Sequence, residues 1–351
     1  MTLRWNSVPG ATTHTLYLAG SSPVIPANIA AFTDGRRISG VSSPYTLTGL
    51  PNGKTWYLVV TATNAAGEGS ASRELAARAT GLDAALAPTA QEVLVLELIN
   101  RARANPQAEA ARYNMGLNEG LTGNPISADP KAPLAYNIRL QTAARDHSQW
   151  MLDTNIFSHT GINNSNVTER ILAAGYSLTG NWATGENIAV SGTSGGAINL
   201  TDMARQQHEN LFRSAGHRTN ILNTAFRELG VGQLRGNYTF GSGQTFLSSM
   251  LTEVFARSGN TWFLTGVVYN DLNNNDFYDP GEGMGDISLQ VNDRYYEIYP
   301  SGAYSVPLGN GTHTITLHGN YPGLPRQQSV TVQNANVKMD IVRRGQNLQL
   351  R

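Results

Sequence analysis

Residues 271–282 carry oxygen-bearing side chains at the spacing of a calcium-binding loop. Donors fall at the first, third, fifth, ninth and twelfth positions, and the seventh residue can offer its backbone carbonyl. These candidate ligands are Asp271, Asn273, Asn275, Phe277, Asp279 and Glu282. Hard oxygen ligands at every second residue suit a large, hard cation, and the final glutamate can close the site with both oxygens. The segment therefore predicts a calcium site.

The sixth position departs from the usual calcium loop, because Asp276 stands where glycine normally makes a sharp turn. Aspartate tolerates the left-handed backbone region better than most residues, so the loop can still make this turn. Three carboxylates predict an affinity of about micromolar to millimolar, which suits a calcium-rich external medium. The alternative is a solvated polar loop that binds no cation.

Short strands surround this loop in residues 262–345, where an EF-hand would have helices. Alternating apolar and polar residues predict strands at 263–269, 287–291, 295–299, 312–317, 329–332 and 337–342. The zone resembles the B-type domain of bacterial surface proteins (SdrD B-like). That resemblance implies a β-sandwich with a calcium-binding loop.

Helical spacing dominates the middle of the chain. One apolar stripe comprises Val95, Leu98, Ile99 and Ala102. This helix should end near Asn105, because Pro106 disfavours helix in the residue before it. A second helix should begin with Asn137 as its N-cap, and its apolar stripe contains His147, which predicts a core or rim residue. A third helix at 201–213, with strands near 228–233 and 246–256, makes this zone α+β.

Seven short segments of this zone follow one another in a fixed order. They are Leu98–Arg103, Ala143–Ser148, Phe157–Gly161, Arg170–Tyr176, Gly185–Ala189, Gly216–Leu222 and Glu228–Gly232. Together they resemble the CAP superfamily in its cysteine-free bacterial branch of SCP-like extracellular domains. The resemblance implies an α-β-α sandwich over residues 92–258.

The same resemblance implies a cleft that gathers two histidines and two glutamates. Segment by segment, the matching residues are His159, His217 and Glu186. The second glutamate normally lies on the helix before the Gly-His segment, where this chain does not align with the family. His208 and Glu209 are the candidates to replace it there.

Such a cleft has three possible roles. Two neutral imidazoles can ligate a labile zinc or magnesium ion while Glu186 orients one of them. Alternatively, Glu186 and a bound water can form a hydrolytic base. In the third interpretation, His159 and His217 belong to a polar network that only holds the sheet and helices together.

The N-terminal zone, residues 1–80, alternates apolar and polar residues between turn clusters, which predicts an antiparallel β-sandwich. Trp5, Tyr17, the segment 50–53 and the segment 56–67 resemble a fibronectin type III domain. Trp56 stands where that family usually has its corner tyrosine. The Gly53–Thr55 segment does not predict nucleotide binding, because Gly49 is one residue too close and a strand follows. Residues 81–91 are interpreted as a linker.

Composition narrows the class of protein. Basic and acidic side chains number 25 each and charged residues make up 14%, so we expect no broad field for nucleic acid. The absence of cysteine excludes disulfides, thiolate metal sites and a cysteine nucleophile. The sequence contains no apolar run of about 18 residues, so it predicts no membrane span. The first residues have no signal-peptide pattern and read as part of a strand, so we expect a fragment of a longer exported protein.

These observations predict a multidomain protein, secreted or on a bacterial surface, with a central α+β domain between two all-β sandwiches. The leading hypothesis is a recognition protein whose cleft binds a small apolar molecule, a glycan or a peptide. A second is a metal-dependent extracellular hydrolase of peptides or cell-wall material. A third is a structural component of an envelope or matrix. The sequence favours binding over catalysis, because the fourth cleft residue has no clear match.

Overall fold

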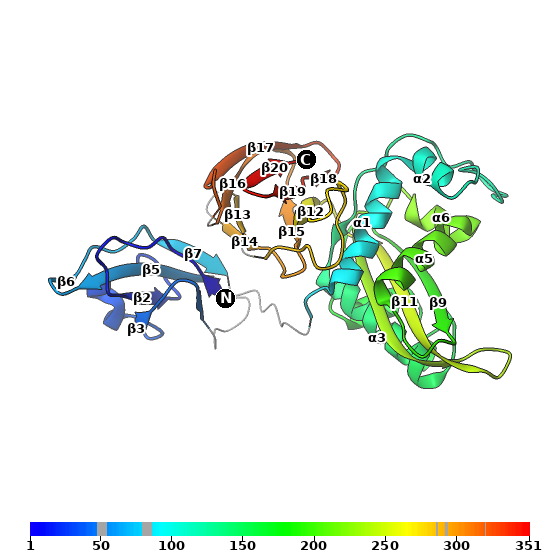
Figure 1. The fold of residues 1–351 in the computed structure, drawn as a ribbon, viewed down its shortest axis with the longest axis horizontal. Helices are drawn as coiled ribbons and strands as arrows, with labels where there is room; N and C mark the ends of the chain where they lie inside the picture. Colours follow the sequence, from blue (N-terminus) through cyan, green and yellow to red (C-terminus); the bar gives the residue numbers. More distant parts are fainter. Residues whose placement is uncertain (48–54, 79–85, 286, 292–293, 320) are drawn as a thin grey trace.

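The computed structural model describes residues 1–47, 55–78, 86–285, 287–291, 294–319 and 321–351. Figure 1 shows three groups of elements, with the C-terminal strands lying between the N-terminal strands and the helical region. Within the described residues, no helix combines the length and apolar character needed to cross a membrane. The Leu50–Gly53 segment, Lys54 and the first part of the expected linker, 81–85, lie outside the described residues.

The N-terminal group contains a main sheet and a two-stranded ribbon. The main sheet consists of β2 (Thr13–Ala19), β3 (Arg36–Val41), β5 (Thr55–Asn64), β6 (Gly67–Glu68) and β7 (Leu75–Arg78). The ribbon pairs β1 (Thr2–Leu3) with β4 (Tyr45–Thr46), and the 3-10 helix η1 spans Pro26–Ala31. Side chains alternate as predicted, since Trp56 and Leu58 enter one apolar cluster and Tyr57 and Val59 another.

Helix ends in the middle group follow their capping residues. Thr89 and Glu92 form a capping box at the start of α1 (Ala90–Ala104), and Asn137 caps α3 (Ile138–Thr154) as predicted. The predicted stop at Asn105 is also confirmed. Pro106 then opens a second helix, since a first-turn residue needs no N–H donor. The helices that complete the group are α2 (Pro106–Arg112), α4 (Val167–Ala173), α5 (Leu200–Arg213) and α6 (Ala215–Ile221), with a short 3-10 turn η2 (Ile162–Asn164).

A four-stranded sheet lies between these helices. Its order is β8 (Ala135–Tyr136), β10 (Glu228–Thr239), β11 (Thr245–Arg257) and β9 (Ala183–Thr193), so β9 is an edge strand. Met250 and Val254 of β11 pack on the α3 side, whereas Leu251 and Phe255 face α1 and α5. Helix α3 approaches β10 so closely that a Cβ on Gly230 would lie 2.1 Å from the backbone of Gln141. The middle group therefore has helix, sheet and helix layers.

Two sheets form the C-terminal group. One contains β12 (Trp262–Asn270), β15 (Ala303–Leu308), β18 (Val337–Lys338), β19 (Ile341–Arg344) and β20 (Asn347–Leu350). The other contains β13 (Ser288–Val291), β14 (Arg294–Glu297), β16 (Gly311–His318) and β17 (Arg326–Val332). The predicted strand at 337–342 is instead two strands, and the sequence pattern missed β15 and β20.

The helical region and the C-terminal strands share a continuous apolar core. Tyr278 and Val342 belong to the same buried cluster as Leu134 and residues of α1 and α5. The rings of Tyr136 and Tyr299 also meet edge to face, with centroids 5.3 Å apart. A buried core across both groups ties them more tightly than a simple spacer would be tied.

Candidate functional site

Glu186 is the centre of a polar cluster at the edge of the four-stranded sheet. Its side chain is buried on β9, and its two carboxylate oxygens have different partners. Arg170 donates to Oε2 at 2.5 Å, and His159 contacts Oε1 through Nδ1 at 2.8 Å. Since a carboxylate accepts hydrogen bonds, Nδ1 of His159 is the donor and the neutral ring carries its lone pair on Nε2.

The α4 helix and the loop before it hold Arg170 in place. Asn166 caps α4 in a capping box with Glu169. One guanidinium nitrogen of Arg170 donates to the carbonyls of His159 and Ser165, at 3.1 and 2.7 Å. Gly161 makes room for this arrangement, because a Cβ there would lie 2.9 Å from the same nitrogen.

His147 lies beside Glu186 and adds a third histidine to the cluster. As predicted, it is buried on the apolar stripe of α3, and its ring stacks on Trp150. Its Nε2 lies 2.9 Å from the carbonyl of Ser158 and 3.9 Å from Oε1 of Glu186. Burial lowers the pKa of His147, so the ring is neutral near pH 7. Nδ1 is buried and has no hydrogen-bond partner among the described residues.

His217 approaches the same cluster from the start of α6. Burial, and then the neighbouring His159, lower the pKa of His217, and its backbone carbonyl accepts a hydrogen bond from the side-chain amide of Asn187 at 3.3 Å. The amide of Asn220 donates to the backbone carbonyl of Glu186 at 3.1 Å and to Oδ1 of Asn187 at 2.9 Å. These bonds fasten α6 to β9. The structure thus brings His159 into contact with Glu186 and places His217 on the helix fastened beside them.

A second buried carboxyl, Glu253 of β11, lies behind this edge. Asn187 donates to its Oε2 at 2.9 Å, while Oε1 is buried without a partner among the described residues. Burial raises the pKa of Glu253 to about 7, against the opposing effect of the Asn187 bond. Sequence reasoning missed this residue, although an acidic side chain inside the apolar strand predicted at 246–256 was a signal.

His208 and Glu209 do not reach Glu186. His208 is fully buried and contacts Oε1 of Glu109 at 3.0 Å, and Arg101 binds the same oxygen at 2.6 Å. Burial raises the pKa of Glu109, but the bonds from His208 and Arg101 outweigh it and lower the value to about 2. Glu209 pairs with Arg213 at 2.8 Å on the helix surface. The structure therefore supplies no substitute for the missing fourth cleft residue from this helix.

His159 and His217 are the two imidazoles that a metal ion in this region would use. Over the described part of the chain, no group of three or more histidine, aspartate or glutamate side chains is placed to hold one. A His159 ring whose Nδ1 donates to a carboxylate presents Nε2 outward, which is the arrangement that orients many metal-binding histidines. Two protein ligands give a labile site that water or another ligand would complete.

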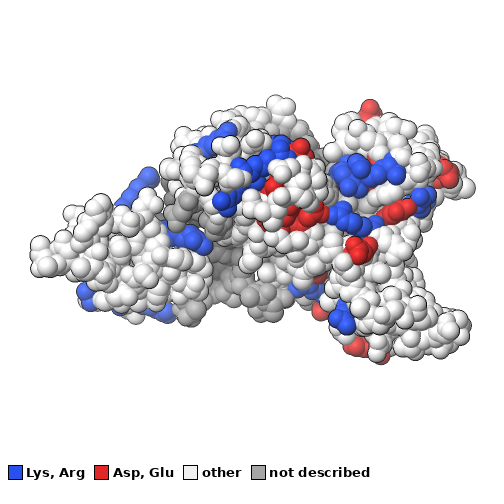
Figure 2. Space-filling view, in the orientation of Figure 1, with Lys and Arg blue, Asp and Glu red and all other residues white. Residues whose placement is uncertain are grey.

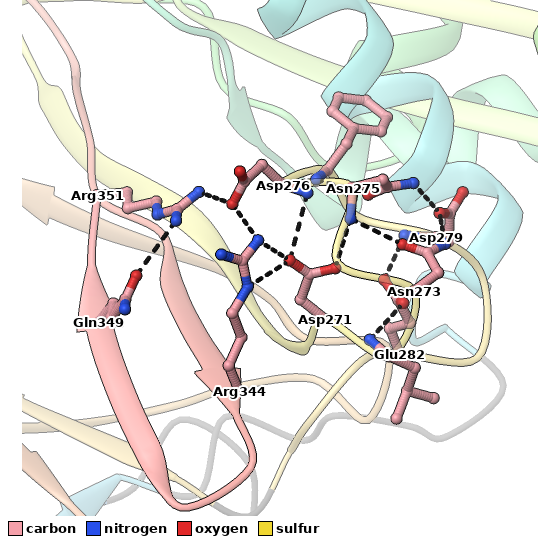
Figure 3. Close-up of polar contacts among 11 residues, drawn as sticks. Asp271, Asn273, Asn275, Asp276, Asp279, Glu282, Arg344, Gln349 and Arg351 are labelled. Atoms are coloured by element: carbon pink, nitrogen blue, oxygen red, sulfur yellow. Dashed lines mark hydrogen bonds and ion pairs between the residues drawn. The ribbon is translucent and has the colours of Figure 1, made fainter.

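The 271–282 loop forms a second polar cluster, shown in Figure 3. Oδ1 of Asp271 accepts from the amide of Asn275 at 3.1 Å, and Glu282 accepts from the amides of Leu272 and Asp279, each at 2.9 Å. Asp276 has a φ of 62°, so the loop does make the left-handed turn. The candidate carboxylates Asp271 and Glu282 therefore already cap backbone amides within the loop.

Arginines surround this loop. Arg344 contacts Asp271 and Asp276, and Arg351 also contacts Asp276 (Figure 3). Burial raises the pKa of Asp271, but Arg344 and the backbone amides of Asp276 and Asn275 together outweigh that effect and the net shift is downward. Figure 2 shows acidic and basic side chains close together over the C-terminal strands and the helical region, on a face that is otherwise mostly uncharged.

A family model described as CAP, the cysteine-rich secretory protein family, matches residues 96–250. This part of the chain is a CAP domain. The match covers α3, β9 and α6, which carry His147, Glu186 and His217. Since the chain has no cysteine, this CAP domain is held together without disulfides.

Three solved structures have weak similarity to the chain. An outer surface protein from Borrelia burgdorferi is 17% identical, with 36% of this chain and 78% of that chain covered and a TM-score of 0.25. An extracellular SCP-domain protein from Bacillus anthracis str. Ames is 18% identical, with 60% and 67% covered and a TM-score of 0.30. NaASP2, crystallised with Zn2+, is 15% identical, with 47% and 76% covered and a TM-score of 0.28. No curated protein sequence matches the chain.

Proposed function

We propose that this is a recognition protein, secreted or displayed on a bacterial surface, whose CAP domain binds its ligand beside His159 and His217. The ligand would be a small apolar molecule, a glycan or a peptide, and a labile zinc or magnesium ion would complete the site. One observation carries the proposal: Glu186 fixes the His159 ring through Nδ1 at 2.8 Å. The fixed ring, more than half of it exposed, is prepared to bind and costs little to order.

Binding is favoured over hydrolysis by the way Glu186 is used. A general base needs a carboxylate oxygen that is available to a water molecule. At Glu186, Oε1 is committed to His159 and Oε2 to Arg170. The alternative function is a metal-dependent extracellular hydrolase of peptides or cell-wall material. It is further disfavoured because the second glutamate of the family's cleft has no match in this chain. A purely structural envelope or matrix component would bind no ligand at this cleft.

The flanking regions fit a surface or secreted protein. We propose that residues 1–80 are a fibronectin type III-like module and residues 262–345 a B-type module, acting as spacers or adhesive surfaces around the CAP domain. In support, β5 of the first region and β13 of the second alternate more and less buried residues over most of their length, and the sheets of each region enclose apolar clusters. The shared core supports a firm attachment of the second module to the CAP domain.

We also propose that the 271–282 loop binds calcium. Its donor set fits, because it consists of carboxylate, amide and carbonyl oxygens at the required spacing. Asn273 and Asn275 at present donate their side-chain N–H groups to Oδ2 of Asp279, at 2.8 and 2.7 Å. These two amides must turn to present oxygen to a cation, and the three carboxylates of the loop must move closer together, since no three acidic side chains of the described residues are placed to hold an ion as they stand. That rearrangement agrees with an affinity of about micromolar to millimolar.

Isothermal titration with zinc, repeated with magnesium, tests the cleft. The wild type is expected to bind one zinc ion there, and His159→Ala and His217→Ala should each weaken binding about tenfold or more. His313→Ala is the matched control, because this partly exposed histidine lies in the C-terminal strands. Equal zinc affinity in all four proteins would contradict the metal component of the proposal. Casein or peptidoglycan turnover that Glu186→Gln abolishes would instead establish the hydrolase.

A further inference from the structure

We infer that the 271–282 loop is a calcium-operated latch, through which cation binding tightens the attachment of the C-terminal strands to the CAP domain. The inference rests on the calcium site proposed above. It concerns what that site controls, and three consecutive loop residues carry it: Phe277, Tyr278 and Asp279. Each of them contacts the CAP domain in a different way.

Asp279 connects the two parts through one carboxylate. Its Oδ1 pairs with Arg205 of α5, while its Oδ2 accepts from the amides of Asn273 and Asn275 inside the loop. The Arg205 side chain is 40% exposed and that of Asp279 is 20% exposed, so this ion pair alone contributes modestly. Its importance is positional, because a candidate calcium ligand is also the partner of a CAP-domain helix.

Phe277 and Tyr278 add apolar contacts to the same attachment. The guanidinium of Arg101, on α1, lies 5.1 Å from the centre of the Phe277 ring. Tyr278 is buried in the shared core with residues of α1 and α5, and its ring meets Tyr269 at 6.1 Å. Arg101 also binds Glu109, which in turn contacts His208 of α5. A packed chain of side chains therefore runs from the loop to both helices.

A cation in the loop would act directly on this attachment. Neutral amide donors now neighbour Oδ2 of Asp279, and a divalent ion would replace them with a stronger, charged partner. Fixing Asp279 also fixes the two residues before it, and so lowers the chance that the loop leaves the CAP domain. Coupling of this kind is reciprocal: if calcium stabilises docking, then docking raises calcium affinity by the same factor.

Hydrogen exchange measured by mass spectrometry on the full chain, with and without calcium chloride, tests the latch. Calcium should slow amide exchange in peptides from α1 and α5 at least about threefold. Arg205→Gln should reduce that slowing and lower calcium affinity, measured by isothermal titration, by a similar factor. Arg213→Gln is the matched control, because it removes an arginine from the same helix that pairs only with Glu209 among the ion pairs described.

Asp271→Asn separates the two proposals. Calcium binding that disappears in Asp271→Asn together with the slowed exchange of α1 and α5 would support the latch. Calcium binding by the wild type with no change in α1 and α5 exchange would overturn the latch and leave the calcium site intact. If the wild type binds no calcium, both the site and the latch are wrong.

Discussion

Two buried glutamates of the CAP domain have nearly the same partners. Glu186 is held by Arg170 at 2.5 Å and His159 at 2.8 Å, and Glu109 by Arg101 at 2.6 Å and His208 at 3.0 Å. The difference lies in the histidines: the side chain of His159 is 58% exposed, whereas that of His208 is 0% exposed. Only His159 can meet a ligand from solution.

A contact between a carboxylate and a histidine is therefore not enough to identify a binding site. Around Glu109, the pair is closed between α1, α2 and α5, and it holds helices together. Around Glu186, the same pair stands at a sheet edge, and the carboxylate orients a ring that solvent reaches. The first cluster should therefore affect mainly stability, and the second mainly binding.

The largest expected effect is that of Glu109→Ala. The substitution leaves His208 and part of Arg101 buried without their shared carboxylate, which should cost about 3–5 kcal/mol of unfolding free energy. Urea denaturation measures the loss. Glu209→Ala, on the exposed surface of α5, is the control and should change stability by less than about 0.5 kcal/mol. A loss of unfolding free energy below about 1 kcal/mol for Glu109→Ala would contradict a stabilising role for the Glu109 cluster.

Glu253 differs from both Glu186 and Glu109, because no arginine or histidine binds its buried carboxyl among the described residues. Its pKa is about 7 in the folded chain, against an ordinary value of 4.5. Between these values the unfolded chain loses the proton while the folded chain keeps it, so stability falls as pH rises from about 4.5 to 7. At about 1.4 kcal/mol per unit, the fall attributable to Glu253 is about 3 kcal/mol.

Glu253→Gln should remove this part of the pH dependence and stabilise the protein above pH 7. Urea denaturation of both proteins at several pH values provides the measurement. Burial also raises the pKa of Glu97 to about 7, but both proteins retain Glu97, so its contribution cancels in the comparison. Parallel stability curves for wild type and variant would show that Glu253 does not titrate in this range.

His208→Ala and His159→Ala compare the two histidines directly. The first removes a fully buried ring that donates to Glu109, which should cost about 2 kcal/mol and leave zinc binding unchanged. The second removes a largely exposed ring, so stability should change by less than about 0.5 kcal/mol while zinc binding falls. Thermal melts measure the stability of both variants, and zinc titration measures their affinity. A loss of zinc binding in His208→Ala together with a loss of stability in His159→Ala would contradict the roles assigned to the two clusters.

The smallest expected effect concerns Arg344, whose charge lies beside Asp271 and opposes an incoming dication. Arg344→Gln should raise calcium affinity about threefold to tenfold, which corresponds to about 1 kcal/mol. Isothermal titration measures the change, and Arg326→Gln, on β17, is the control. Weaker calcium binding in Arg344→Gln would mean that the arginine positions Asp271 for the cation.

Local signals in the sequence were enough for many elements. The Asn137 cap, the stop before Pro106 and the alternation along β5 depend on neighbours a few residues away, and each prediction is confirmed. By contrast, β15 contains Pro307 and β20 is short and half polar, so neither shows a clear strand pattern. These two strands exist because they pair with neighbouring strands, β15 with the longer β12 and β20 with β19.

The polar clusters were harder to predict, because their partners are distant in sequence. Family resemblance selected His159, His217 and Glu186, and the structure places His159 in contact with Glu186 and His217 on the adjoining helix α6. It gave no reason to expect Arg170 or His147 at Glu186, since their approach depends on how α4 and α3 pack against the sheet. His208 follows the opposite logic: its sequence position suggested the cleft, but its face of α5 points to Glu109.

Nitrogen-15 NMR of the histidine rings, recorded during a zinc titration, tests directly whether Glu186 orients His159 so that its Nε2 binds the ion. We predict that His159 has its proton on Nδ1, and that zinc shifts the Nε2 signals of His159 while leaving those of His208 unchanged. A His159 ring protonated on Nε2, or a zinc response confined to histidines outside the Glu186 cluster, would contradict the account.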